Sequence, residues 1–148
     1  MDAGFSHLPS ELSKFVNKID KGTYDAVFGK RPLWSPRYKV KLLRRIYSLC
    51  ATLLPNFLLG MKFKDISSGY ESFNLKTLKK IISQPFLSTG HSWHIEVKYR
   101  CKDLNYTEIP ITYNFPSNTI ALLTLKNSIF VLFSLWLDRM KAKISKKQ

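Results

Sequence analysis

The sequence predicts an α/β fold, on three observations. Segments in which apolar residues recur at helical spacing alternate with short β-rich runs along the 148 residues. Apolar residues make up 45% of the chain and aromatic residues 14%, which is enough for a buried core and too much for a disordered chain. The length supports one domain with a terminal appendage. Only two cysteines are present, which excludes a disulfide scaffold, and both Cys50 and Cys101 are expected to be buried.

The first half of the chain is expected to hold two helices around one strand. Leu8-Pro9-Ser10-Glu11 is typical of a helix start, because proline is tolerated in the first turn, and this helix should run to about Asp20. The apolar run from Tyr24 to Phe28 predicts a buried strand. From about Tyr38 to Leu59 apolar residues recur at helical spacing and predict a second helix, which Pro55 is expected to kink or end.

The second half continues the alternation. The expected elements are helices over residues 75–83, 91–104 and 120–143, and a strand over residues 106–113. The strand contains Pro110, which cannot donate a ladder hydrogen bond, so the strand is expected at an edge of the sheet.

Positive charge is concentrated in one stretch. The formal net charge is +14, and residues 26–64 contain no acidic residue and nine basic ones. Such a surplus implies a polyanionic partner, and the phosphate groups of a ligand are one candidate. Arg44 and Ser48 lie one helical turn apart, so they share a face and can hold one phosphate group. Arg31 follows a strand end, where ligand-contacting loops of α/β folds lie. The alternative is a merely basic surface.

The carboxyl-terminal helix is strongly apolar over residues 128–137. A helix that spans a membrane needs about 20 apolar residues, and this run is shorter and is preceded by Lys126. An amphipathic helix that lies on an anionic membrane surface fits better, since a basic tail follows it. The alternative is a core helix packed on its own domain. The basic residues of the tail are Arg139, Lys141, Lys143, Lys146 and Lys147.

Four segments carry a resemblance to a known family. They are Met1-Asp2-Ala3-Gly4-Phe5-Ser6-His7; Val27-Phe28-Gly29-Lys30-Arg31; Leu59-Gly60 followed by Asp65-Ile66-Ser67-Ser68-Gly69-Tyr70-Glu71; and residues 90–100 with Glu108-Ile-Pro-Ile-Thr112. In this order they resemble the carboxyl-terminal part of a family 2 glycosyltransferase with the GT-A fold. The resemblance is to dolichol-phosphate mannosyltransferases and other polyprenyl-phosphate sugar transferases.

The resemblance implies an architecture. Residues 1–118 would form the carboxyl-terminal part of a GT-A (nucleotide-diphospho-sugar transferase, Rossmann-like) domain that lacks its amino-terminal nucleotide-binding half. Residues 119–148 would form the amphipathic, membrane-associating helix and its basic tail. The abrupt start at Met1-Asp2-Ala3-Gly4, which resembles a strand end and the loop after it, supports a missing upstream half. The protein would attach peripherally to the cytoplasmic side of a membrane.

The resemblance also implies a divalent cation. Asp2 would be the carboxylate that meets Mg²⁺ or Mn²⁺, and the cation would hold the diphosphate of a nucleotide-sugar donor. The second carboxylate of the family motif is replaced by Gly4, and Ser6 is the later polar ligand, so binding of the cation should be weakened.

Further roles follow for residues that match the family motifs. Arg31, Arg44 and Ser48 match positions that hold phosphate groups of the donor and of the lipid acceptor. Asp65, Ser68 and Gly69 match the turn on the acceptor side, where Gly69 is expected to supply a positive φ. Glu96 matches an acidic residue of the helix that lines the site, with a structural hydrogen bond as the alternative. His91 and His94 are candidates for the mouth of the acceptor site or for simple packing.

Three functions are therefore considered. The first is a hexosyltransferase that moves a sugar from a nucleotide-sugar to a polyprenyl or dolichyl phosphate and is active only when completed by the missing half, either within a longer enzyme or from a separately encoded chain. The second is an inactive remnant that binds a membrane or phosphate groups. The third is a nucleic-acid binder, suggested by the pI of about 9.9 but ranked last because no nucleic-acid motif is present.

Overall fold

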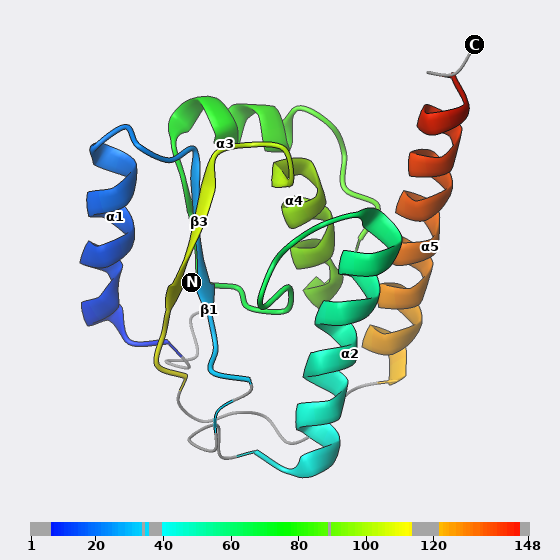
Figure 1. Cartoon of the computed structure of the whole chain (residues 1–148), viewed down its shortest axis with the longest axis horizontal. Helices are drawn as coiled ribbons and strands as arrows, with labels where there is room; N and C mark the ends of the chain where they lie inside the picture. The colour runs from blue at the N-terminus through cyan, green and yellow to red at the C-terminus, as the bar shows by residue number, and fades with distance from the viewer. Residues whose placement is uncertain (1–6, 34, 36–39, 89, 114–121, 146–148) are drawn as a thin grey trace.

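The computed structural model describes residues 7–33, 35, 40–88, 90–113 and 122–145. A small mixed sheet lies between helices on both of its faces (Figure 1). The α/β class predicted from the sequence is confirmed. In chain order the elements are the 3₁₀ turn η1 (Pro9–Glu11), α1 (Leu12–Asp20), β1 (Ala26–Lys30), α2 (Leu42–Leu59), β2 (Glu71–Phe73), α3 (Leu75–Ile82), the 3₁₀ turn η2 (Gly90–Ser92), α4 (Trp93–Cys101), β3 (Tyr106–Pro110) and α5 (Leu122–Ser145).

The sheet has three strands in the order β2-β1-β3. The central strand β1 is antiparallel to β2, with Ala26 opposite Phe73, and parallel to β3, with Ala26 opposite Tyr106. Strand β3 is at an edge of this sheet, as Pro110 predicts. Residues Ala26 to Gly29 of β1 are all buried, because both faces of the strand are covered.

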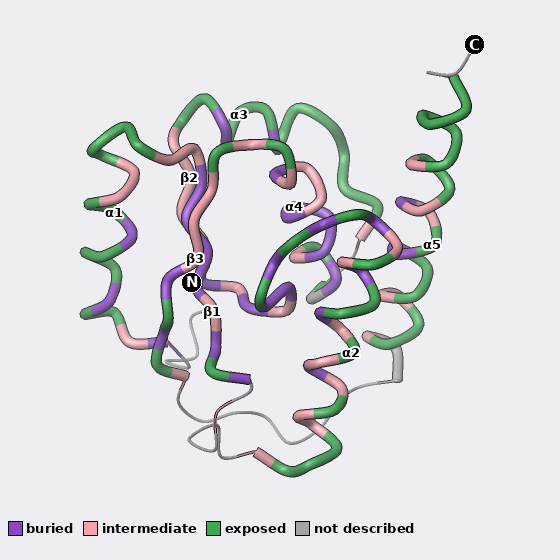
Figure 2. Tube along the Cα trace, viewed as in Figure 1, coloured by how far each residue is buried: buried purple, intermediate pink, exposed green. Residues whose placement is uncertain are grey.

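Two apolar clusters hold the layers together. Phe28 belongs to the larger one, which includes Leu59 of α2 and Val131 of α5. Val27, on the other face of β1, belongs to a second cluster under α1, where the rings of Phe15 and Tyr70 stack at 4.2 Å. Figure 2 shows buried positions gathered along the strands and on the inner sides of the helices. The alternation of side chains along β1 therefore joins both clusters through one strand.

The structure differs from the local expectations at three points. Pro55 does not end helix α2, which continues to Leu59 and is followed by Gly60, whose left-handed φ of 67° is typical of a residue that terminates a helix. Strand β2 was not expected, because three residues carry no recognisable alternation. Cys101 is buried, but Cys50 is exposed on the outer side of α2.

Helix α5 packs against α2, α4 and η2 (Figure 1). Val131, Leu132 and Leu135 are buried in the larger cluster, so the core-helix alternative holds for this face. On the opposite face Phe130 and Phe133 are exposed. None of the helices within the described residues is long and apolar enough to cross a membrane.

Candidate functional site

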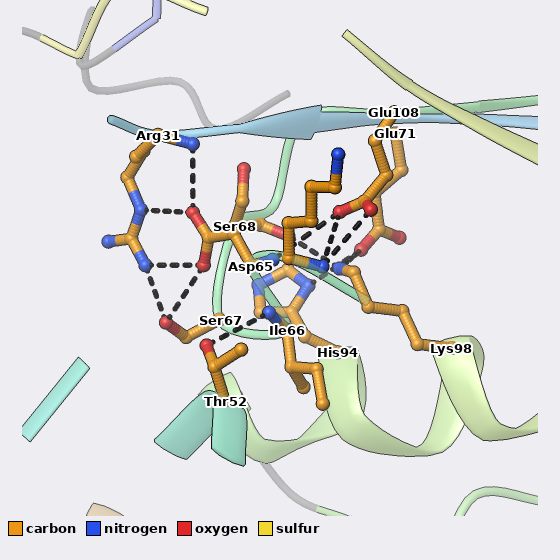
Figure 3. Close-up of polar contacts among 11 residues, drawn as sticks. Arg31, Thr52, Asp65, Ile66, Ser67, Ser68, Glu71, His94, Lys98 and Glu108 are labelled. Carbon is orange, nitrogen blue, oxygen red and sulfur yellow. Dashed lines mark hydrogen bonds and ion pairs between the residues drawn. The ribbon is translucent and has the colours of Figure 1, made fainter. Parts of the chain in front are cut away.

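Arg31 and Asp65 form a buried ion pair beyond the end of β1 (Figure 3). The Nε and Nη2 atoms of Arg31 donate to the two carboxylate oxygens of Asp65 at 2.7 and 2.8 Å, and the Arg31 backbone N–H donates to Oδ2 at 3.0 Å. Nη2 also donates to the hydroxyl of Ser67. This two-pronged geometry fixes the plane of the guanidinium group relative to the segment that carries Asp65.

The segment that carries Asp65 is held by α2 and β3. The Asn56 side chain of α2 accepts from the Phe63 N–H at 3.0 Å and donates to the Phe63 carbonyl. The carboxylate of Glu108 in β3 accepts from the backbone N–H of Lys64 at 2.9 Å and of Asp65 at 3.3 Å. Asp65 itself lies outside any helix or strand, so these hydrogen bonds fix its position.

The charge state of Asp65 is set by two opposing effects. Burial by itself raises the pKa of its carboxyl group, but the charge and hydrogen bonds of Arg31 outweigh burial and lower the pKa. Asp65 is therefore a carboxylate that balances Arg31, and not a proton donor. Burial raises the pKa of Glu108, although the backbone N–H groups of Lys64 and Asp65 oppose that change.

A second buried charge cluster lies on the far side of the same turn (Figure 3). Lys98 of α4 donates to Oε1 of Glu71 at 2.6 Å and to the carbonyl oxygen of Ser68 at 2.8 Å. Nδ1 of His94 lies 3.3 Å from the same Glu71 oxygen. Burial alone raises the pKa of Glu71, but Lys98 and His94 lower it overall.

Gly69 has no positive φ, so the expected reason for glycine at this position is wrong. The physical reason is close approach: a Cβ atom here would lie 2.6 Å from Cε1 of the His94 ring. Beside it, Ser68 is buried, and its hydroxyl has no hydrogen-bond partner in the described part of the chain. His94, on α4, therefore packs against this turn. Of the two roles that the sequence analysis considered for His94, the acceptor-site mouth and simple packing, this contact corresponds to packing.

Arg44, Ser48 and Thr52 follow one another at four-residue spacing, so they form a row along one side of α2. At one end of the row, the hydroxyl of Thr52 accepts from the Ile66 N–H at 3.3 Å, beside Asp65. Ser48 is buried, and Arg44 is partly buried with its guanidinium 5.7 Å from the Tyr47 ring centre. The row leads from the Asp65 turn toward the start of α2.

Glu96 is not brought together with these residues. Its carboxylate accepts from the backbone N–H groups of Leu87 and Ser88 and from Arg100, 2.7 Å away. Two residues along a helix correspond to a rotation of about 200°, so Glu96 points away from the side of α4 that carries His94 and Lys98. In this structure Glu96 holds the loop before η2.

The expected cation ligand Asp2 lies outside the described residues, as do Gly4 and Ser6. Within the described ranges no group of three or more His, Cys, Asp or Glu side chains is placed to hold a metal ion. The divalent cation therefore stays a prediction.

Sequence reasoning missed the pair of Lys98 and Glu71. A lysine on a helix is ordinarily solvated, and Glu71 lies 27 positions away in the chain. One signal was present: Ile95 and Cys101 lie three positions before and after Lys98, so the lysine shares a helix side with two apolar residues.

Curated relatives match the chain, among them two bacterial enzymes, while no protein-family model matches it. The polyprenol monophosphomannose synthase of Mycolicibacterium smegmatis is 32% identical over 116 residues, which cover 76% of this chain and 43% of the relative. The undecaprenyl-phosphate mannosyltransferase of Micrococcus luteus is 30% identical over 118 residues, which cover 76% of this chain and 47% of the relative. The chain thus spans less than half the length of the curated relatives it matches.

Proposed function

Because the chain is similar in sequence to polyprenyl-phosphate sugar transferases, we propose that it acts in the transfer of a sugar, mannose in the first instance, to a polyprenyl phosphate. The sequence similarity of this chain to the two relatives confirms its resemblance to polyprenyl-phosphate sugar transferases. The proposal depends on this observation. The donor would be a nucleotide-sugar, bound with the help of a second half of the GT-A fold.

The acceptor phosphate would bind along the row on α2. Arg44 supplies positive charge and Ser48 a hydroxyl on one face, and the buried Nε atom of Arg44 has no hydrogen-bond partner among the described residues. A polyprenyl phosphate is already an anionic nucleophile, so the site needs to position it and neutralise its charge rather than remove a proton. Arg31, balanced by Asp65, would orient the donor side of the same site.

An apolar hollow of about 340 Å³ lies next to this row. Its lining residues are Leu49, Thr52, Leu53, Asn56, Phe63 and Lys64. Thr52 belongs both to the row and to the hollow, so a ligand with a phosphate head and an apolar chain could occupy the two together. This arrangement supports a lipid phosphate as the acceptor.

Mg²⁺ or Mn²⁺ would complete the donor site. Asp2 would be its protein ligand, and Gly4 in place of a second carboxylate would leave most of the coordination shell to the diphosphate and water. The cation would stabilise the charge that develops on the departing diphosphate.

We also propose peripheral attachment to an anionic membrane, on its cytoplasmic side. The outer faces of α2 and α5 are both apolar, with Phe57 82% and Phe133 56% exposed. Exposed aromatic and aliphatic side chains on amphipathic helices bury themselves among lipid head groups. Lys126, Lys141 and Lys143 on α5 are exposed beside them and would attract anionic lipid.

Ligand binding tests the acceptor site directly. Farnesyl phosphate should bind the wild-type chain, and Arg44→Ala should weaken binding about tenfold or more, because a charge-assisted hydrogen bond is lost. Lys79→Ala on α3 removes the same charge from an exposed position and should leave binding unchanged. Equal affinity of the Arg44→Ala variant and the wild type would remove Arg44 from the site.

A transfer assay separates the enzyme from the inactive remnant. Membranes that contain the chain together with the second half of the fold should transfer mannose from a nucleoside diphosphate mannose to farnesyl phosphate, and Arg44→Ala should abolish the transfer. Binding of farnesyl phosphate without any transfer would instead favour the phosphate-binding remnant.

Vesicle flotation tests the membrane surface. The chain should float with vesicles that contain phosphatidylserine, and Phe57→Ser or Phe133→Ser should reduce the floating fraction. Leu75→Ser is the matched control, since Leu75 is 66% exposed on α3. Wild-type protein that stays in the soluble fraction with these vesicles would refute the attachment.

A further inference from the structure

The proposed sugar transfer assigns no role to the buried pair of Lys98 and Glu71. The side chain of Lys98 is fully buried and that of Glu71 is 2% exposed. The ammonium group lies 5.0 Å from the centre of the Phe28 ring, inside the larger apolar cluster. Removing two charges from water is costly, and apolar residues of similar volume often replace such a pair without loss of stability. Stability alone therefore does not explain its presence.

The pair is placed at one end of the turn that carries Asp65. Asp65 opens the turn and is held by Arg31, and Glu71 closes it and is held by Lys98. Between them Lys98 also binds the carbonyl oxygen of Ser68. The turn is thus fastened to β1 through one ion pair and to α4 through the other (Figure 3).

The groups around Glu71 complete the fastening. His94 faces the Glu71 carboxylate from the same helix as Lys98, and its ring packs on Gly69. Loss of the ammonium group would leave the Ser68 carbonyl without its donor and the Glu71 carboxylate with His94 alone. The middle of the turn could then shift relative to Asp65, which α2 and β3 hold independently.

We infer that Lys98 and Glu71 are positioning residues, which orient the turn over residues 65–71 beside the α2 row along which the lipid phosphate is proposed to bind. The inference rests on the proposed function for its ligand, but the orientation of the turn can be measured without one. Neither residue transfers a proton or contacts the reacting atoms.

The decisive variant replaces both charges. Glu71→Leu leaves the buried Lys98 ammonium without its counter-charge, and Lys98→Met leaves the buried Glu71 carboxylate with His94 alone, so each should lower the urea midpoint strongly. The double variant K98M/E71L removes both charges and should recover most of the wild-type midpoint. The conservative variant Lys98→Arg keeps the charge at the pair and should retain partial function.

Local hydrogen exchange measures the turn itself. In the double variant the amide of Gly29, which donates to the Tyr70 carbonyl beside Glu71, should exchange about tenfold faster or more than in the wild type. The amide of Leu78, bonded to the Asn74 carbonyl in α3, is the internal control and should not change. Farnesyl phosphate should bind the double variant about tenfold or more weakly, and Lys98→Arg should fall between the two.

These measurements test the inference and the proposed function separately. A double variant with wild-type stability, wild-type exchange at Gly29 and wild-type binding would overturn the inference, and so would a double variant that does not fold. Wild-type protein that fails to bind farnesyl phosphate would refute the proposed function alone, because exchange at Gly29 still reports whether the pair orients the turn.

Discussion

Arg31 and Asp65 lie 34 positions apart in the chain, and their side chains meet in a two-pronged ion pair from which water is almost excluded. Arg31 comes from the end of the central strand, and Asp65 from a turn that follows α2. The pair therefore joins the sheet to the turn at the site that we propose for the phosphate ligand. Its strength can be measured without any ligand.

Asp65→Asn should destabilise the fold by about 3–5 kcal/mol, because it leaves the Arg31 guanidinium buried without its counter-charge. The free energy of unfolding from urea denaturation measures this loss. Asp103→Asn removes an equal charge from an exposed position and should change stability by less than about 0.5 kcal/mol. Similar small losses in both variants would show that the ion pair is not formed in solution.

Acid should destabilise the protein below about pH 4. The folded-state pKa of Asp65 is lowered, so its contribution to stability is present above the unfolded value of about 3.9 and is lost as pH falls through the folded value. Glu71, whose pKa is also lowered, acts in the same direction. Urea denaturation at pH 7 and at steps down to pH 3 should show this decline.

Two variants separate the carboxylates in that experiment. The Asp65→Asn variant should have a lower free energy of unfolding than the wild type at every pH. Between pH 4 and pH 3, however, its free energy of unfolding should fall less than that of the wild type. Glu108→Gln should keep the decline below pH 4, because the pKa of Glu108 is raised and its burial lowers stability at higher pH instead. A decline of equal steepness in Asp65→Asn and the wild type would contradict the assignment.

The order of elements could be predicted because it depends on local signals. Pro9 near a helix start and the apolar run before Gly29 act within a few residues, and both gave elements close to those observed. The strand over residues 71–73 could not be found in this way, since it exists through pairing with β1 and not through its own pattern.

The site was predictable only in part, for the same reason. Arg44 and Ser48 share a helix face because their spacing fixes it. The partner of Arg31 was not predicted, since the approach of Asp65 depends on bonds from Asn56 and Glu108, which lie far away in the sequence. Gly69 was assigned a positive φ, whereas its small size serves the close approach of the His94 ring.

Gly69→Ala should destabilise the protein by about 1–3 kcal/mol, the usual range for an overpacked site. The added Cβ would stand 2.6 Å from Cε1 and 2.9 Å from Nε2 of His94, so the ring would have to leave its place beside Glu71. In a His94→Ala background the same change should cost much less. An equal cost in both backgrounds, measured by urea denaturation, would exclude the ring as the cause.

Gly22 beyond the end of α1 and Gly60 at the end of α2 form a matched pair of glycines. Gly22 and Gly60 both have a left-handed backbone, with φ of 65° and 67°. A Cβ at position 22 would meet nothing within 4 Å, whereas at position 60 it would meet the guanidinium of Arg139. Gly22→Ala should cost only the backbone strain, about 1–2 kcal/mol, and Gly60→Ala should cost about 1 kcal/mol more, because the flexible Arg139 side chain can move aside but loses its hydrogen bond to Leu58.

The additional destabilisation by Gly60→Ala, compared with Gly22→Ala, should come from Arg139. Its Nη1 atom donates to the Leu58 carbonyl in the last turn of α2. A positive group here is favourable, because the final carbonyl groups of a helix carry partial negative charge. In an Arg139→Ala background Gly60→Ala should cost no more than Gly22→Ala. If Gly60→Ala still costs more than Gly22→Ala in the Arg139→Ala background, the crowding at position 60 does not come from Arg139. The side chain of Arg139 would then be available to the basic tail that the sequence predicts.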